Sequence, residues 1–132
     1  MRYALTVQYI GKNYFGSQIQ FQKGEQIAEP TIQGTLERSI STLIFGDTEN
    51  RNRRIKTVFS GRTDKGVNSL GQVAHFDIDK NIVASDFVYH LNEILPEDIS
   101  VSDLRQVNNK FHAQKSAKRR QYRFEFINLS DV

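Results

Sequence analysis

The chain of 132 residues contains no cysteine, which excludes a disulfide framework, a thiolate nucleophile and a zinc ribbon. This absence also fits the reducing conditions of the cytoplasm, and we expect a cytoplasmic protein. The three histidines, His75, His90 and His112, are too far apart in the sequence to form a local pair of metal ligands. We therefore expect no metal site.

Long apolar runs are also lacking. No run approaches the roughly 20 residues that a membrane-spanning helix requires, so we expect no membrane association. The first residues alternate like a strand and contain no apolar signal-peptide core. The composition, with 38% hydrophobic, 11% aromatic and 25% charged residues, is typical of a globular protein. The length fits a single domain spanning residues 1–132.

Positive charge is concentrated in two parts of the chain, although the net charge is only +3. Residues 51–65 and 110–123 together hold 12 of the 18 lysines and arginines, and the only acid in either segment is Asp64. Clustered cations gain affinity for a polyanion by releasing its condensed counterions. The segregation therefore favours a nucleic-acid partner, with two solvated basic loops as the alternative.

Apolar spacing predicts an α+β fold with one mixed, mainly antiparallel sheet of about five strands and two helices packed on one face. The strands are expected at residues 2–9, 56–60, 72–78, 99–104 and 120–126. The first helix is expected to begin after Thr31 as its N-cap and to stop at Gly46. The second carries the apolar residues of 87–95, with Ser85 as a candidate cap and Pro96 beyond its end. Residues 10–30 form a polar, glycine-punctuated stretch.

The stretch Ser60-Gly61-Arg62-Thr63-Asp64-Lys65-Gly66-Val67 holds the most informative chemistry. Its glycines permit backbone angles that other residues resist, and a loop between two strands commonly displays functional groups. Nearby cations favour the ionised form of a carboxylate, which can attack an electrophilic carbon to form a covalent intermediate. The alternative is ordinary hairpin-turn chemistry, with Asp64 bonded to its own backbone.

The order of several blocks along the chain resembles the TruA family of tRNA pseudouridine synthases. The similarity is most specific where Gly61-Arg62-Thr63-Asp64 runs on through Val67 to Gly71-Gln72-Val73-Ala74-His75-Phe76. Further blocks resembling the family lie at residues 9–11, 16–20, 31–37, 91–96, 111–113 and 120–124. The resemblance covers nearly the whole chain, and the order of the blocks is more specific than any single block.

The resemblance implies a ferredoxin-like half of a catalytic domain that isomerises uridine to pseudouridine in the anticodon stem-loop of tRNA, without a cofactor. Asp64 matches the family's nucleophile. Arg62 matches the arginine that flips the target nucleotide and positions the aspartate, and Tyr122 matches the tyrosine that stacks on the uracil. Extrusion of a base costs a few kcal/mol, which stacking and hydrogen bonds offset.

Other residues have roles that remain open at this stage. Tyr122 shares a strand face with two phenylalanines, so a core position is its alternative. His75 is expected to be structural, and His112 to pack or to touch phosphate. Five cations are expected to contact the RNA backbone: Lys110, Lys115, Lys118, Arg119 and Arg120.

The chain departs from the family pattern at Ile10, Ser17, Lys65, Asn68 and Gln114, none of which removes the expected nucleophile. Family members continue into a second half that completes the sheet, so we interpret the chain as an N-terminal domain that does not turn over alone. The resemblance also implies a homodimer. The alternatives are a non-catalytic RNA-binding domain and a domain that only binds other proteins.

Overall fold

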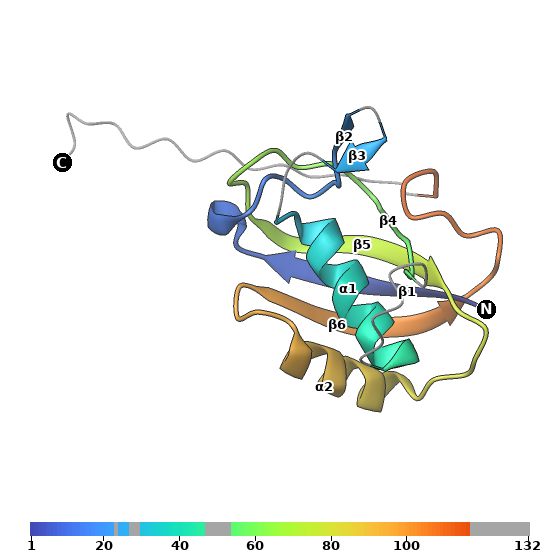
Figure 1. The fold of residues 1–132 in the computed structure, drawn as a ribbon. Helices are drawn as coiled ribbons and strands as arrows, with labels where there is room; N and C mark the ends of the chain where they lie inside the picture. The colour runs from blue at the N-terminus through green and yellow to red at the C-terminus, as the bar shows by residue number, and fades with distance from the viewer. Residues whose placement is uncertain (23, 27–29, 47–53, 117–132) are drawn as a thin grey trace, which may run out of the picture.

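The computed structural model describes residues 1–22, 24–26, 30–46 and 54–116 of the chain (Figure 1). In chain order the elements are strand β1 (Arg2–Tyr9), the 3₁₀ helix η1 (Gly11–Asn13), the short strands β2 (Phe21–Gln22) and β3 (Glu25–Gln26), helix α1 (Ile32–Phe45), strands β4 (Thr57–Phe59) and β5 (Ser69–Asp77), helix α2 (Ala84–Ile94) and strand β6 (Ile99–Val107). The expected strand at 120–126, and with it Lys118, Arg119, Arg120 and Tyr122, lies outside the described residues.

Four strands form the main sheet in the order β4-β5-β1-β6, and every neighbouring pair is antiparallel. The connection from β1 through α1 to β4 leaves a gap that β5 fills, and the connection from β5 through α2 to β6 leaves a gap that β1 fills. Both helices lie on the same face of the sheet (Figure 1). Two interleaved split βαβ units of this kind make a ferredoxin-like fold, which confirms the predicted α+β class.

The core lies between the helices and one face of the sheet. Alternate residues of the central strand β1 point into it, and Tyr3, Leu5, Val7 and Tyr9 are all at most 3% exposed. The predicted apolar faces meet them from the other elements, through Ile32, Leu36 and Ile40 on α1, Phe87 and Leu91 on α2, and Ala74, Phe76 and Ile78 on or just after β5. Period-two and period-3.6 burial on these elements explains why the sequence pattern predicted them correctly.

The ends of α1 confirm the prediction, whereas the start of α2 corrects it. Thr31 is extended, and its side chain accepts a hydrogen bond from the Gly34 N–H at 3.1 Å. Gly46 ends α1 with a φ of 78°, a conformation that favours glycine. The N-cap of α2 is Val83, without a side-chain hydrogen bond, so the expectation of Ser85 was wrong: Ser85 already lies within the first turn.

Two strands are longer than the sequence pattern predicted. β5 begins at Ser69, three residues before the expected start at residue 72. β6 continues to Val107, and Asp103, with a φ of 54°, shifts the alternation so that Leu104 faces the core. The polar stretch at residues 10–30, in which the sequence pattern predicted no element, contains η1 and the β2–β3 hairpin.

Candidate active site

The loop between β4 and β5 displays Arg62 and Asp64 at the end of the sheet where β1 also ends, and both side chains are exposed. Within the described part of the chain, neither side chain has a hydrogen bond or an ion pair. Arg62 is therefore not simply the salt-bridge partner of Asp64, and the Asp64 carboxylate does not bond to its own turn. Both groups face solvent and are accessible to a ligand.

Thr63, directly before Asp64, is held at three polar atoms. Its N–H donates to the Ser17 Oγ at 2.8 Å, and its carbonyl oxygen accepts from the Ser17 N–H at 3.0 Å. Its hydroxyl lies 2.7 Å from the Tyr9 hydroxyl. Ser17 and Tyr9 are 1% and 3% exposed, so these bonds form in a nearly dry environment.

Tyr9 belongs to a small buried network that also fixes the start of the loop. The Gln72 Nε2 donates to the Tyr9 hydroxyl at 2.9 Å, while the Gln72 Oε1 accepts from the Gly61 N–H at 2.9 Å. Burial raises the pKa of Tyr9, so its hydroxyl keeps its proton at neutral pH. With Gln72 donating to it, the Tyr9 hydroxyl can donate its proton to Thr63.

Two glycines allow the segment after β1 to press against the loop. A Cβ atom at Gly11 would lie 2.0 Å from the Val67 carbonyl oxygen, which leaves no room for any other residue. The Gly11 N–H donates to the Asn68 side chain at 2.8 Å. Gly16 has a φ of 83°, and a Cβ atom there would lie 2.9 Å from the Thr63 carbonyl oxygen. The glycines of this segment therefore serve close backbone packing against the loop.

The N-terminus of α1 in turn holds the residues that hold the loop. The Ile32 N–H donates to the Gly16 carbonyl oxygen at 3.2 Å, and the Gln33 N–H to the Ser17 carbonyl oxygen at 2.8 Å. These are N–H groups that a helix leaves without an intrahelical partner. The start of α1 is thus linked to Asp64 through Ser17 and Thr63.

Cations flank the exposed carboxylate in the sequence. Arg62 and Lys65 flank it two residues before and one after. The Lys65 ammonium lies 4.6 Å from the centre of the Phe15 ring, a cation–π contact that joins the loop to the segment after β1. A polyanion bound here would meet these cations together with a single carboxylate.

A hollow of about 270 Å³ borders the motif at Arg62. Its lining combines residues from the segment after β1, α1, β4 and the chain after β6: Ser17, Gln18, Gln33, Thr57, Val58, Phe59, Gly61, Arg62 and Gln114. Because Gln114 and Arg62 share this lining, the described parts of the two basic segments lie side by side. Lys110 and Lys115, two of the cations expected to contact RNA, are exposed on the segment after β6.

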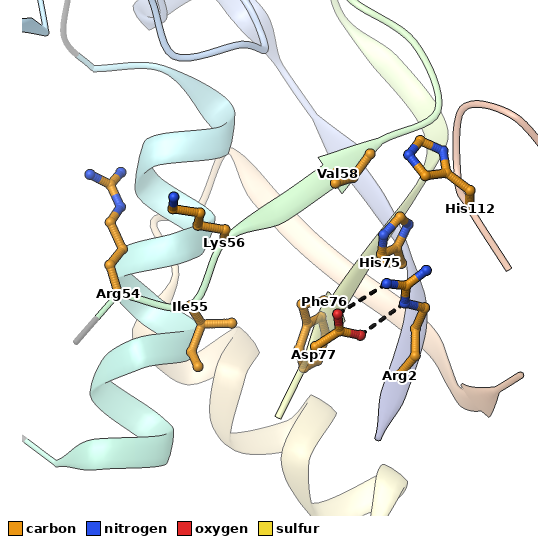
Figure 2. A pocket seen from close by; sticks show the side chains of 9 residues that line it. All are labelled: Arg2, Arg54, Ile55, Lys56, Val58, His75, Phe76, Asp77 and His112. Carbon is orange, nitrogen blue, oxygen red and sulfur yellow. Dashed lines mark hydrogen bonds and ion pairs between the residues drawn. The ribbon is translucent and has the colours of Figure 1, made fainter. Parts of the chain in front are cut away.

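A larger hollow of about 450 Å³ lies over β4, β5 and the start of β1, and its lining includes neither Arg62 nor Asp64 (Figure 2). Arg2 pairs there with Asp77 at 2.8 Å, and the His75 and His112 rings lie with their centres 5.0 Å apart. His75 is 4% exposed, and its Nδ1 accepts from the Ala113 N–H at 3.0 Å. This histidine anchors the segment after β6, in agreement with the expected structural role.

The sequence did not predict which side chains hold the loop that carries Asp64. Tyr9, Ser17 and Gln72 were named as parts of blocks that resemble the family, but none was expected to hold the loop that carries Asp64. The available signal was that the blocks at 9–11 and 16–20 accompany the Asp64 block in the resemblance. Their side-chain bonds to it depend on the sheet order, which places β1 next to β5.

Two features are absent from the described residues. No three histidine, aspartate or glutamate side chains in this part of the chain gather closely enough to hold a metal ion. Neither helix in the described ranges combines the length and apolar character needed to cross a bilayer.

A family model described as tRNA pseudouridine synthase matches residues 5–114. The tRNA pseudouridine synthase A of Bacillus licheniformis is 42% identical over 124 residues, which cover 94% of this chain and 46% of that protein. The enzyme of the same name from Colwellia psychrerythraea is 37% identical, with 97% and 44% covered. The one from Limosilactobacillus reuteri is 39% identical, with 96% and 48% covered.

The chain belongs to the tRNA pseudouridine synthase family, because the family model matches most of its length. It spans about half the length of the curated relatives that it matches.

Proposed function

We propose that this chain is the N-terminal half of a cytoplasmic tRNA pseudouridine synthase that acts on the anticodon stem-loop with Asp64 as its nucleophile. The observation that carries the proposal is the Asp64 carboxylate, which is exposed and has no partner among the described residues. The loop that carries it is held by hydrogen bonds at Thr63, before Asp64, and at Asn68, after it. The chain also belongs to the tRNA pseudouridine synthase family. A nucleophile must be both accessible and fixed, and Asp64 meets both conditions.

The reaction replaces the bond between C1′ of the ribose and N1 of the uracil with a bond between C1′ and C5. The Asp64 carboxylate attacks an electrophilic carbon of the flipped uridine, either C1′ of the ribose or C6 of the uracil, and the C1′–N1 bond breaks. The uracil turns, and C5 forms a bond to C1′ as the bond to Asp64 is released. C5 loses its hydrogen and N1 gains one, so substrate and product have the same formula and no cofactor is consumed.

The remaining residues prepare this step. Arg62, exposed two residues before Asp64 and lining the 270 Å³ hollow, takes the place of the target base in the helix and orients the carboxylate. Tyr122 stacks on the extruded uracil. Lys110, Lys115, Lys118, Arg119 and Arg120 hold the RNA backbone, which positions the substrate without specifying it. A second half completes the sheet and the active site, and two such subunits form a homodimer, which sedimentation of the full-length protein would detect.

The decisive variant is Asp64→Asn in the full-length protein, assayed by release of tritium from tRNA that carries [5-³H]uridine. We expect product formation to fall by more than about 1000-fold, because the amide is not a nucleophile, while the Kd for tRNA changes little. The matched control is Asp79→Asn, which removes another exposed carboxylate, beyond the opposite end of β5. Undiminished turnover by Asp64→Asn would exclude the proposal and favour a non-catalytic RNA-binding domain.

A further inference from the structure

We infer that Tyr9 and Ser17 are positioning residues for the Asp64 carboxylate. Neither lies in the motif that contains Asp64, and they are joined to Thr63 across 54 and 46 residues of sequence. The inference rests on the proposed role of Asp64 as the nucleophile, and it adds the groups that determine where this nucleophile stands.

Ser17 holds the peptide plane that enters Asp64, and the side chains of Ser17 and Tyr9 hold Thr63 itself. The Thr63 carbonyl belongs to the planar unit that joins Thr63 to Asp64, and it accepts from the Ser17 backbone N–H at 3.0 Å and from the Ser17 hydroxyl at 3.5 Å. The Ser17 hydroxyl holds the Thr63 N–H at 2.8 Å, and the Tyr9 hydroxyl holds the Thr63 side chain at 2.7 Å. Rotation of Thr63 would break these bonds.

The peptide plane that leaves Asp64 is fixed as well. The Asp64 carbonyl accepts from the Val67 N–H at 3.2 Å, and Val67 is packed against Gly11. With both flanking planes held, the backbone dihedrals of Asp64 are set, and only its two side-chain torsions remain free. The exposed carboxylate therefore stands on a rigid base.

Burial separates this role from RNA binding. Tyr9 is 3% exposed and Ser17 is 1% exposed, so almost no surface of either side chain is available to a bound tRNA. Loss of either hydroxyl can affect the substrate only through the position of the loop. A misplacement of about 1 Å costs an enzyme as much as 100-fold in rate, because reacting atoms must be aligned within a few tenths of an ångström.

The test uses the full-length protein and separates kcat from KM in the tritium-release assay. For Tyr9→Phe and Ser17→Ala we expect kcat to fall by about 10- to 100-fold, with the KM for tRNA within about threefold of the wild type. Ser17→Thr keeps the hydroxyl, so we expect its kcat to be higher than that of Ser17→Ala and closer to the wild type.

The matched control is Tyr14→Phe. Tyr14 is 5% exposed, and its hydroxyl donates to Asp98, away from the Asp64 loop. This variant loses a buried tyrosine hydroxyl of the same kind, and we expect it to keep the wild-type kcat. A fall in kcat that is equal in Tyr9→Phe and Tyr14→Phe, or a raised KM with unchanged kcat, would overturn the inference.

Asp64→Asn, assayed in the same series, keeps the two proposals apart. If it abolishes turnover while Tyr9→Phe and Ser17→Ala retain the wild-type kcat, Asp64 is the nucleophile and the positioning role is wrong. If Asp64→Asn retains turnover, the proposed function itself fails. If circular dichroism shows that Tyr9→Phe does not fold, the comparison of Ser17→Ala with Ser17→Thr decides. A kcat that is low in Ser17→Ala and recovered in Ser17→Thr supports the positioning role, whereas the same kcat in both variants contradicts it.

Discussion

Two acidic residues of this chain occupy opposite environments, and the difference decides what each can do. Glu37 on α1 is 2% exposed, and its Oε2 accepts from the Thr57 N–H at 2.8 Å and from the Thr57 hydroxyl at 3.0 Å. Its Oε1 lies 2.9 Å from the Arg54 Nε. Asp64 is exposed, and its carboxylate has no hydrogen bond or ion pair among the described residues. Glu37 therefore joins α1 to β4, whereas Asp64 is left to act on a ligand.

His75 gives the stability of the domain a dependence on pH. Its pKa is lowered from the ordinary value of 6.5, first by burial and then by the charges of Arg2 and His112, with Asp77 acting in the opposite direction. As the pH falls below about 6.5, the unfolded chain binds a proton at this residue more readily than the folded chain does, so the folded state loses stability. We expect the free energy of unfolding, measured by urea titration, to decrease from pH 7.5 to pH 5.5.

His75→Gln tests this assignment, because glutamine keeps an acceptor for the Ala113 N–H without a titrating ring. The decrease between pH 7.5 and 5.5 should be smaller in this variant than in the wild type. His90→Gln, which changes an exposed histidine on α2, should keep the wild-type decrease. An identical pH dependence in wild type and His75→Gln would show that His75 is not its source.

At the scale of elements, α1 does more than cover the sheet. Its first N–H groups donate to the Gly16 and Ser17 carbonyl oxygens, and its cap residue Thr31 is fully buried. Helix N-termini need such acceptors, since their first N–H groups have no partner within the helix. The same bonds that complete α1 therefore hold the segment on which the Asp64 loop rests.

Thr31→Ala should lower the free energy of unfolding by about 1 kcal/mol, because it leaves the buried Gly34 N–H without its acceptor. Thr42→Ala is the control on the same helix. Thr42 is exposed, and alanine favours helix more than threonine does. The free energy of unfolding of Thr42→Ala should therefore be unchanged or slightly higher than that of the wild type. Equal urea midpoints for the two variants would contradict the role of Thr31 as the cap.

At the scale of the whole molecule, the described sheet ends in two outer strands, β4 and β6, each paired on one side only within the described residues. The chain spans about half the length of its curated relatives. In our proposal, a second half completes this sheet and the substrate cleft. The exposed Asp64 is then one side of a site to which the other half contributes the rest.

The 132-residue chain alone should bind tRNA weakly and release no tritium from [5-³H]uridine-labelled tRNA. Its binding should weaken with salt, with a log–log slope of about −0.7 for each neutralised phosphate in a single-stranded region. A gel-shift titration at several salt concentrations measures this slope. Repeated turnover by the chain alone would contradict our assignment of the catalytic unit to the longer protein.

Much of the fold could be predicted because the signals are local. The alternation of Tyr3, Leu5, Val7 and Tyr9 predicts β1, and the cap at Thr31 with the stop at Gly46 brackets α1. The start of α2 was less predictable, because Val83 makes no side-chain cap bond and Ser85 offered a stronger but misleading signal. The shift at Asp103 escaped prediction, since a bulge depends on the partner strand.

The sequence by itself determined the helices, the main strands and the motif around Asp64, because periodicity, capping and turn chemistry act over a few neighbouring residues. Only the tertiary structure decided that Tyr9, Ser17 and Gln72 meet around the base of that motif. The bonds that join Tyr9 to Thr63, Ser17 to Thr63 and Gln72 to Tyr9 span 54, 46 and 63 residues. Contacts over such separations depend on the order of strands in the sheet, which no local pattern specifies.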